Sequence, residues 1–448
     1  MSKKYRIVNA RIVNEGKIFK GNIIINNGII EDIINIDNFR EYKNDDDSII
    51  IDVNGKYLFP GVIDTHVHFR EPGLTHKADI FTESKAAVAG GVTSFMEMPN
   101  TIPNTTTLEL LEDKFKLASE KSLANYSFYF GASNDNIQEI DKIDFENTCG
   151  IKVFMGASTG NMLVDNITSL NKIFSNTNII ISVHSEDNKI INDNLEKYKA
   201  KYGDNIPFKY HPLIRSREAC IKSTKFAVNT ALKYNTHLNI LHISTKEELE
   251  ILKSVKESNI TSEACLNYLF FNDNDYDKYG ALIKCNPAIK SREDQQALKN
   301  AVFDDDIDLI STDHAPHLFN EKNKSYLNSP SGTPNVQHLL PAILEFYHNN
   351  KISLVKIIDK LCHRPAKIFN IKNRGFIRKG YFADIVIVDL NCPWKVNNSN
   401  ILYKCKWSPF NDFTFNSKVI FTFVNGNLIY NNGNINDKNK GQRLIFER

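Results

Sequence analysis

Residues 59–70 read FPGVIDTHVHFR, a short apolar run that ends in His66 and His68 and is followed by Arg70. In an extended strand alternate side chains point to the same face, so these two imidazoles can converge on one metal ion. The guanidinium of Arg70 is a planar positive group suited to a carboxylate. The alternative is two buried histidines that merely have hydrogen-bond partners, and the rest of the chain has to decide between these interpretations.

Size, charge and cysteine usage narrow the kinds of protein that this chain can be. It has 448 residues, which predicts one large domain and a smaller one, and a formal net charge of +2. The well-mixed charges argue against nucleic acid or a membrane surface as the main partner. The seven cysteines show no C-x-x-C spacing, and no run approaches the roughly 20 apolar residues of a membrane span. We therefore expect a cytoplasmic protein with reduced thiols.

The middle of the chain alternates short apolar runs with helix-like segments. The runs lie at residues 62–64, 94–98, 126–130, 151–154, 179–183, 238–241, 261–264 and 309–310. Eight such strand-then-helix units predict a (β/α)₈ barrel. Both ends of the chain are instead rich in strand-like segments, with a hairpin signal at Asn27-Gly28, which predicts that the termini meet in one small sheet domain.

The polar residues suited to chemistry sit mostly at the carboxyl ends of these runs. They are His66 and His68, Asn100, Lys152 within the fourth run, His184, His242 and Asp313. Barrels of this type keep their active sites at that face, whereas histidines buried for packing would not gather at one end of the strands. The ordering therefore favours a catalytic site.

The ligand set indicates two metal ions rather than one. Four histidines and Asp313 exceed what one tetrahedral ion with an open position requires, and they suit two ions that share a nucleophile. Lys152, within the apolar run, is the candidate bridge, because carboxylation by CO₂ would turn its amine into a carbamate with two ligand oxygens. A lysine taken alone is more often a surface or ion-paired residue.

Four motifs carry a family resemblance: HVHFREPG at 66–73, MPNT at 98–101, LHIST at 241–245 and TDHAPH at 312–317. Together they resemble the dihydroorotases of the amidohydrolase superfamily, over nearly the whole chain. The flanking strands look like the split β-sandwich of that superfamily. The resemblance implies a sandwich part at residues 1–58, a catalytic TIM barrel at 59–365 and a second sandwich part at 366–448.

The resemblance also implies roles for the site residues. His66 and His68 would bind a first zinc ion, His184 and His242 a second, and carboxylated Lys152 and a hydroxide would bridge them. Asp313 would ligate the first zinc ion and shuttle the proton. The substrate would be held by Arg70, Asn100, Asn286, His317 and the backbone at Ser331 and Gly332. One branch of the family bridges with an aspartate of an Asp-Asp-Gly motif, but residues 157–160 read ASTG here, so we expect Lys152.

The implied activity is the reversible hydrolysis of dihydroorotate to N-carbamoyl-L-aspartate in pyrimidine biosynthesis, by an enzyme that is commonly a homodimer. The alternatives are an allantoinase, which resembles this chain at His-x-His-Phe-Arg-Glu-Pro-Gly, a hydantoinase or dihydropyrimidinase, and an inactive relative that serves as a scaffold. The polar segment 318–329 is expected to form a mobile loop over the site. The alternative is a surface loop with no role at the site.

Overall fold

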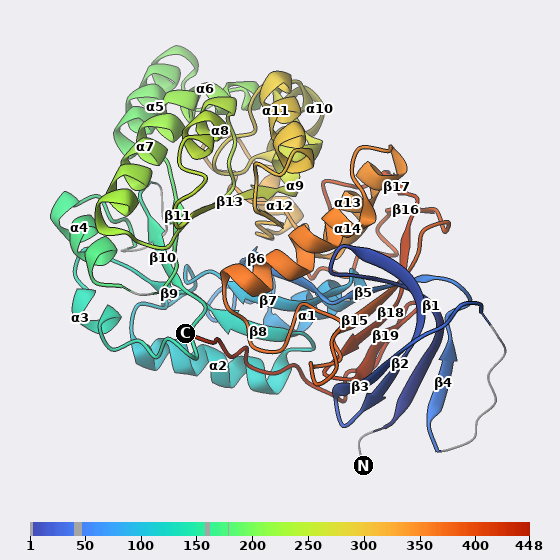
Figure 1. Cartoon of the computed structure of the whole chain (residues 1–448). Coiled ribbons are helices and arrows are strands. Elements are labelled where there is room, and N and C mark those ends of the chain that lie inside the picture. Colours follow the sequence, from blue (N-terminus) through green and yellow to red (C-terminus); the bar gives the residue numbers. More distant parts are fainter. Residues whose placement is uncertain (1–2, 40–46, 157–161, 178) are drawn as a thin grey trace.

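The computed structural model describes residues 3–39, 47–156, 162–177 and 179–448. Figure 1 shows a barrel surrounded by helices and, beside it, a large sheet in which blue strands from the start of the chain lie next to red strands from its end. The fold class expected from the sequence, a (β/α)₈ barrel with a β-rich part built from both termini, is confirmed.

The barrel strands are all parallel to their neighbours. They are β6 (Val62–Val67), β7 (Val92–Glu97), β8 (Asn125–Phe128) continued by β9 (Phe130–Gly131), β10 (Ile151–Phe154), β11 (Ile181–His184), β12 (Leu238–Ile240), β13 (Ile260–Cys265) and β14 (Leu309–Ser311). The backbone N–H of His68 donates to the carbonyl of His314 at 2.7 Å, which joins the first strand to the segment after the last. Each predicted apolar run thus forms a barrel strand.

Helices surround these strands. They are α1 (Ile80–Ala89), α2 (Leu108–Lys121), α3 (Ile137–Ile140), α4 (Ile167–Ser175), α5 (Asn188–Tyr202), α6 (His211–Ile214), α7 (Arg217–Tyr234), α8 (Lys246–Lys253), α9 (Leu266–Phe270), α10 (Tyr276–Tyr279), α11 (Arg292–Phe303), α12 (Phe319–Lys322), α13 (Leu339–His348), α14 (Leu354–Ile358) and α15 (Arg364–Ile368). Helix α1 begins where the Asp79 side chain accepts from the N–H of Thr82, and it ends at Gly90.

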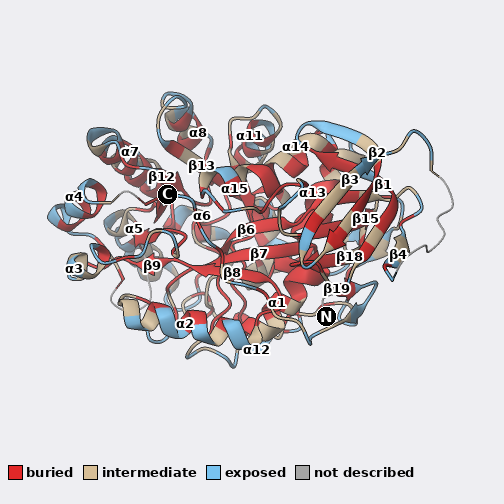
Figure 2. Ribbon diagram, turned by 60° about the horizontal axis from the view of Figure 1, so that its bottom comes forward, coloured by how far each residue is buried: buried red, intermediate tan, exposed pale blue. Residues whose placement is uncertain are grey.

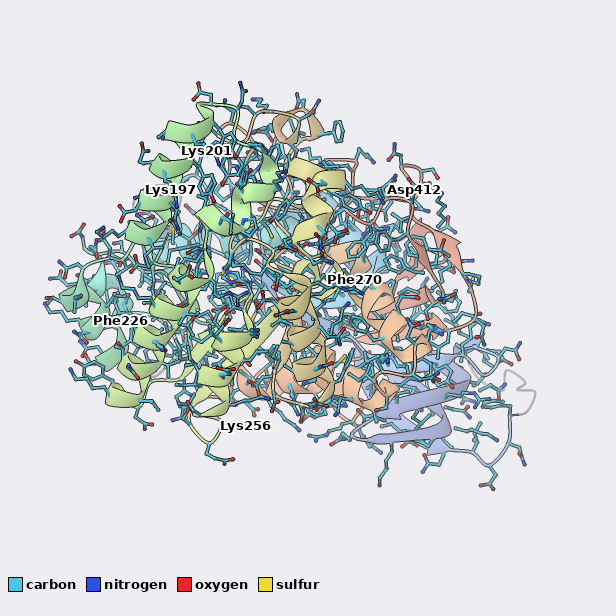
Figure 3. The ribbon with its side chains drawn as sticks, turned by 90° about the horizontal axis from the view of Figure 1, so that it is seen from above. Lys197, Lys201, Phe226, Lys256, Phe270 and Asp412 are labelled. Carbon is cyan, nitrogen blue, oxygen red and sulfur yellow. The ribbon has the colours of Figure 1, made fainter. Side chains whose placement is uncertain are left out.

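The barrel helices expose one face and bury the other. In Figure 2 the barrel strands β6, β7 and β8 are red, whereas helices such as α2, α7 and α8 alternate between buried and exposed residues. Figure 3 shows Lys197 and Lys201 of α5 on the outer edge of the molecule, away from the barrel. Among the helices of the described chain, none combines the length and apolar character that crossing a membrane would require.

The terminal sheet has nine strands in the order β20-β19-β18-β15-β5-β1-β2-β3, with β4 paired to β1. Their bounds are β1 (Tyr5–Asn14), β2 (Lys17–Asn26), β3 (Ile29–Asn35), β4 (Ile49–Asp52), β5 (Tyr57–Pro60), β15 (Ile385–Asp389), β18 (Lys418–Val424), β19 (Asn427–Asn431) and β20 (Asn434–Ile435), and a separate small pair joins β16 (Trp394–Lys395) to β17 (Thr414–Phe415). Asn27 and Gly28 have φ of 50° and 83°, as a tight hairpin turn requires. The domain boundaries stay a prediction.

The end of the chain closes the amino-terminal mouth of the barrel. The N–H of Leu444 donates to the carbonyl of Tyr126 at 2.9 Å, just where β8 begins. Leu444 and Phe446 are buried in one hydrophobic cluster with Ile63 and Tyr129 of the barrel interior. Because this end is packed with apolar side chains, the carboxyl ends of the strands are left as the open mouth.

Candidate metal centre

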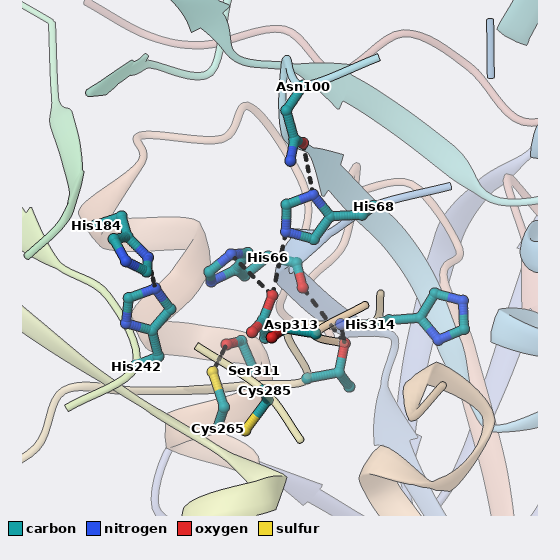
Figure 4. Close-up of polar contacts among 12 residues, drawn as sticks. His66, His68, Asn100, His184, His242, Cys265, Cys285, Ser311, Asp313 and His314 are labelled. Atoms are coloured by element: carbon teal, nitrogen blue, oxygen red, sulfur yellow. Dashed lines mark hydrogen bonds and ion pairs between the residues drawn. The ribbon is translucent and has the colours of Figure 1, made fainter. Parts of the chain in front are cut away.

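A cavity of about 330 Å³ lies at the carboxyl ends of the barrel strands. It brings together every site residue predicted from the sequence, along with Phe154, Ala315 and Pro330. The predicted residues that line it are His66, His68, Arg70, Asn100, Lys152, His184, His242, Asn286, Asp313, His317, Ser331 and Gly332. Figure 4 shows His66 and His68 pointing toward Asp313, and His184 and His242 pointing toward each other.

His66 and His68 face the same oxygen of Asp313. Their Nε2 atoms lie 3.3 Å and 3.1 Å from Asp313 Oδ1. The Nδ1 of His66 lies 2.8 Å from Oε1 of Glu263, and the Nδ1 of His68 lies 2.7 Å from Oδ1 of Asn100. Since both of these partners are acceptors, each Nδ1 carries the proton and donates.

This pattern leaves a place for a cation between the imidazoles and the carboxylate. Burial lowers the pKa of His68 to about 4, so its ring is neutral near pH 7. With the proton on Nδ1, the Nε2 of His68 points a lone pair at an oxygen of Asp313, and the Nε2 of His66 faces the same oxygen. Electron-rich atoms this close need a positive ion between them, which a transition metal would supply.

A second pair lies across the cavity. Nδ1 of His184 is 3.0 Å from Nε2 of His242, and the Nε2 of His184 donates to Glu186 at 2.8 Å. Burial lowers the pKa of His184 and of His242, which keeps both rings neutral. The Nδ1 of His242 is buried and has no hydrogen-bond partner among the described residues.

These separations fit metal coordination. Two ligand atoms on one tetrahedral zinc ion, each about 2.0–2.1 Å from the metal, lie roughly 3.3 Å apart. The three pairs of potential ligand atoms are separated by 3.3, 3.1 and 3.0 Å. The donor set is therefore suited to a metal cofactor.

Lys152 lies on β10 and lines the same cavity as these two groups of ligands. It is only 1% exposed, and its Nζ sits 4.6 Å from the centre of the Phe154 ring. In the part of the chain that the structure describes, no carboxylate is within ion-pair distance of this Nζ. Burial lowers the pKa of Lys152 to about 7, so a large share of the side chain is a neutral amine. Residues 157–160, used above to choose Lys152, lie outside the described residues.

Positive charge gathers around His317, another residue of the cavity wall. Arg70 is 7% exposed, its Nε donates to the carbonyl of Pro316 at 3.1 Å, and its Nη2 lies 3.0 Å from Nε2 of His317. Lys77 Nζ donates to the Nδ1 of His317 at 3.0 Å, and the Nε2 of the same ring lies 3.0 Å from the carbonyl oxygen of Ser331. Within the described residues, no carboxylate pairs with Arg70, so an anionic ligand would be its counterion.

Three of the cavity residues have left-handed backbones. The φ angles of Arg70, His242 and Asp313 are 70°, 40° and 46°. Such conformations cost on the order of 1–3 kcal/mol for residues other than glycine, and strained residues of this kind tend to cluster at functional sites. Here the left-handed conformation occurs at residues whose side chains point into the cavity.

Several residues around the cavity were missed by sequence reasoning. Glu263 on β13 accepts a hydrogen bond from Nδ1 of His66. Its position as a charged residue inside the seventh apolar run is the sequence signal that could have identified it. Glu186 binds both His184 and Arg215, which are distant in sequence from each other, and no spacing indicated that pairing. Lys77 gave no signal, because single lysines are common.

Comparison with known proteins places the chain among hydrolases. The model of the Amidohydrolase family matches residues 57–429. The dihydroorotase of Methanosphaera stadtmanae is 33% identical over 91% of this chain and 92% of that protein, and that of Pyrococcus abyssi is 31% identical over 98% of each.

Among solved structures, the L-hydantoinase (dihydropyrimidinase) from Arthrobacter aurescens superimposes with a TM-score of 0.91 at 25% identity, covering 97% of this chain and 98% of that one. The dihydropyrimidinase from Brevibacillus agri gives 0.90 at 23% identity, covering 99% and 100%, and at that identity it supports the fold alone. The family match spans all the barrel strands and part of the terminal sheet. The chain therefore belongs to the amidohydrolase family.

Proposed function

We propose that this protein is a dihydroorotase, which interconverts dihydroorotate and N-carbamoyl-L-aspartate. The observation that carries the proposal is Arg70, a buried guanidinium in the cavity wall that no carboxylate of the described residues pairs with. Dihydroorotate has a carboxylate that this group can bind, whereas hydantoin and dihydrouracil are neutral rings. The names of the sequence relatives support the same choice.

The ligand assignment follows the two groups described above. His66, His68 and Asp313 would hold one zinc ion, His184 and His242 a second, and carboxylated Lys152 would bridge them. The amine of Lys152 would attack CO₂, forming an N–C bond and releasing a proton, and the low pKa caused by burial supports the neutral amine that this step needs. When bound, the zinc ions would lower the pKa of water toward neutrality and polarise the scissile carbonyl.

The chain's own residues would orient the ring and move the proton. Arg70 and His317 would bind the carboxylate, and the amides of Asn100 and Asn286 would bind the ring; Asn286 Oδ1 is buried with no partner among the described residues. Asp313 would accept a proton from the attacking water and donate it to the ring nitrogen as the C–N bond breaks. The reverse order of steps closes the ring.

Substrate comparison tests the proposal. Purified, zinc-supplemented protein should turn over dihydroorotate in preference to dihydrouracil and allantoin. Turnover of a neutral ring at a comparable kcat/KM would instead favour the hydantoinase alternative, which the structural neighbours suggest. Less than one zinc ion per chain and no turnover would favour the inactive scaffold.

Two further features are part of this proposal. We expect a homodimer, which sedimentation would test. We also expect a cytoplasmic enzyme, since all seven cysteines are unpaired and all but Cys392 are buried.

A further inference from the structure

A buried lysine lies behind the wall of the cavity formed by residues 330–332. Lys322 ends α12 and is 0% exposed. Its Nζ donates to three backbone carbonyls, those of Lys284 at 3.1 Å, Pro330 at 2.8 Å and Gly332 at 2.9 Å. The segment expected to be a mobile loop is thus tied to its surroundings by a buried side chain.

The contacts of Lys322 require its charged form. A carbonyl oxygen only accepts hydrogen bonds, so three carbonyls need three N–H groups, and only the ammonium has three. Burial lowers the pKa of Lys322, but a neutral amine would turn its lone pair toward one of these oxygens. The three carbonyl acceptors therefore stabilise the protonated form of the Lys322 amine.

This charge has no counterion from the protein. Among the described residues, no carboxylate lies within ion-pair distance of Lys322. The neighbouring Lys284 is similar, since its Nζ donates to the carbonyls of Tyr326 at 2.7 Å and Ser329 at 2.6 Å. Glu321, the nearby acid on the same loop, already pairs with Lys77 at 3.1 Å. Burying an unpaired charge is costly, so such a charge calls for a ligand of opposite sign.

Lys322 also fixes the backbone orientation of residues 330–332, which form part of the cavity wall. The carbonyls of Pro330 and Gly332 point to Lys322, whereas the carbonyl oxygen of Ser331 between them lies 3.0 Å from Nε2 of His317. Gly332 has a φ of 138°, and an added Cβ there would meet the carbonyl oxygen of Ala315 at 2.5 Å. Holding the two outer carbonyls therefore sets the direction of the Ser331 carbonyl, and through it the orientation of His317.

We propose that Lys322 is a positioning and specificity residue, which orients His317 through residues 330–332 and adds a fixed positive charge that selects carboxylate-bearing rings over neutral ones. This inference rests on the proposed function, because it assumes a cyclic amide substrate whose carboxylate lies at the Arg70 end of the cavity. It assigns to a residue outside the cavity lining part of the discrimination between dihydroorotate and dihydrouracil.

Lys322→Gln removes the charge but keeps two N–H donors, so the amide can still hold two of the three carbonyls. Lys324→Gln is the matched control, since Lys324 is an exposed lysine on the same loop. With the zinc-loaded enzyme, we would measure KM and kcat for dihydroorotate and the inhibition constant of dihydrouracil. We expect Lys322→Gln to raise the KM by about 10- to 100-fold, as for removal of a nearby charge at the dielectric of a protein site. The dihydrouracil constant should change by less than about threefold, and the control should change neither value.

Equal losses for both ligands would overturn the specificity role, because they would show that the loop had merely lost its shape, and an unchanged KM would overturn it as well. If Lys322→Gln does not fold, Lys322→Arg keeps the charge and the donors, and a folded Arg variant that had lost the preference for the anion would refute the proposal. If the wild-type protein does not turn over dihydroorotate, the proposed function fails. Calorimetric titration with dihydroorotate and dihydrouracil would then still test anion selection in Lys322→Gln, since binding needs no turnover.

Discussion

Replacing Arg70 by alanine should abolish the preference for a carboxylate-bearing substrate while leaving the candidate metal centre intact. The Nε of Arg70 is used by the carbonyl of Pro316, so the two terminal nitrogens remain for a ligand, one of them beside His317. Two charge-assisted hydrogen bonds of about 1.5–3 kcal/mol each amount to roughly 3–6 kcal/mol. That range corresponds to a loss of about 10²- to 10⁴-fold in kcat/KM for dihydroorotate.

The assay is formation of N-carbamoyl-L-aspartate, with zinc content and thermal midpoint measured on the same preparation. Zinc content should stay near the wild-type value, because Arg70 donates to a carbonyl and lies beside His317, not among the candidate ligands. Alanine at a φ of 70° is as strained as arginine, so the substitution does not relax the backbone that carries His68. A kcat/KM within about threefold of wild type would refute the assignment of Arg70 to the substrate carboxylate.

Three other predictions concern the bridge, a residue behind a ligand, and a distant ion pair. Lys152→Met should remove the bridging group and leave fewer zinc ions per chain than wild type, measured by atomic emission on protein whose circular dichroism is unchanged. Glu263→Gln should weaken zinc binding by about 10- to 100-fold in a chelator competition, because it removes the negative charge that His66 Nδ1 faces at 2.8 Å; equal affinities would contradict this role. Burial would raise the pKa of Asp305, but its bonds with Lys360 and Arg364 lower it to about 2. The stability lost in Asp305→Asn should therefore be present above about pH 4 and vanish as the pH falls toward 2, measured by urea unfolding; a difference that persists at pH 2 would show that the charge is not its source.

The candidate site was predictable to the extent that it follows from strand ends. A parallel barrel gathers the carboxyl ends of its strands at one mouth, so His66, His184, His242 and Asp313 were placed together by their order along the chain. The hairpin at Asn27-Gly28 followed from its dipeptide in the same way. In both cases a local sequence pattern determines where the residues lie in the fold.

The residues that hold the ligands in place follow from tertiary packing and not from local pattern. Glu263 reaches His66 from a strand 197 residues away, and Arg215 reaches Glu186 across 29 residues. Lys322 gave no signal either, because its role depends on carbonyls of residues 284, 330 and 332, and every residue carries a carbonyl. Backbone acceptors leave no trace in the identity of the residues that provide them.

The distribution of charge in the cavity explains how one substrate orientation would be selected. The part of the cavity lined by four histidines and Asp313 suits cations, and the part lined by the Arg70 guanidinium suits an anion. Asn100 connects the two ends, because it accepts from His68 Nδ1 at 2.7 Å and also lines the cavity. A ring with a carboxylate on one side and an amide carbonyl on the other satisfies both ends in only one direction, with the carbonyl toward the candidate metal ligands. A neutral ring has no group for the Arg70 end, so it would leave a buried cation unpaired in either direction.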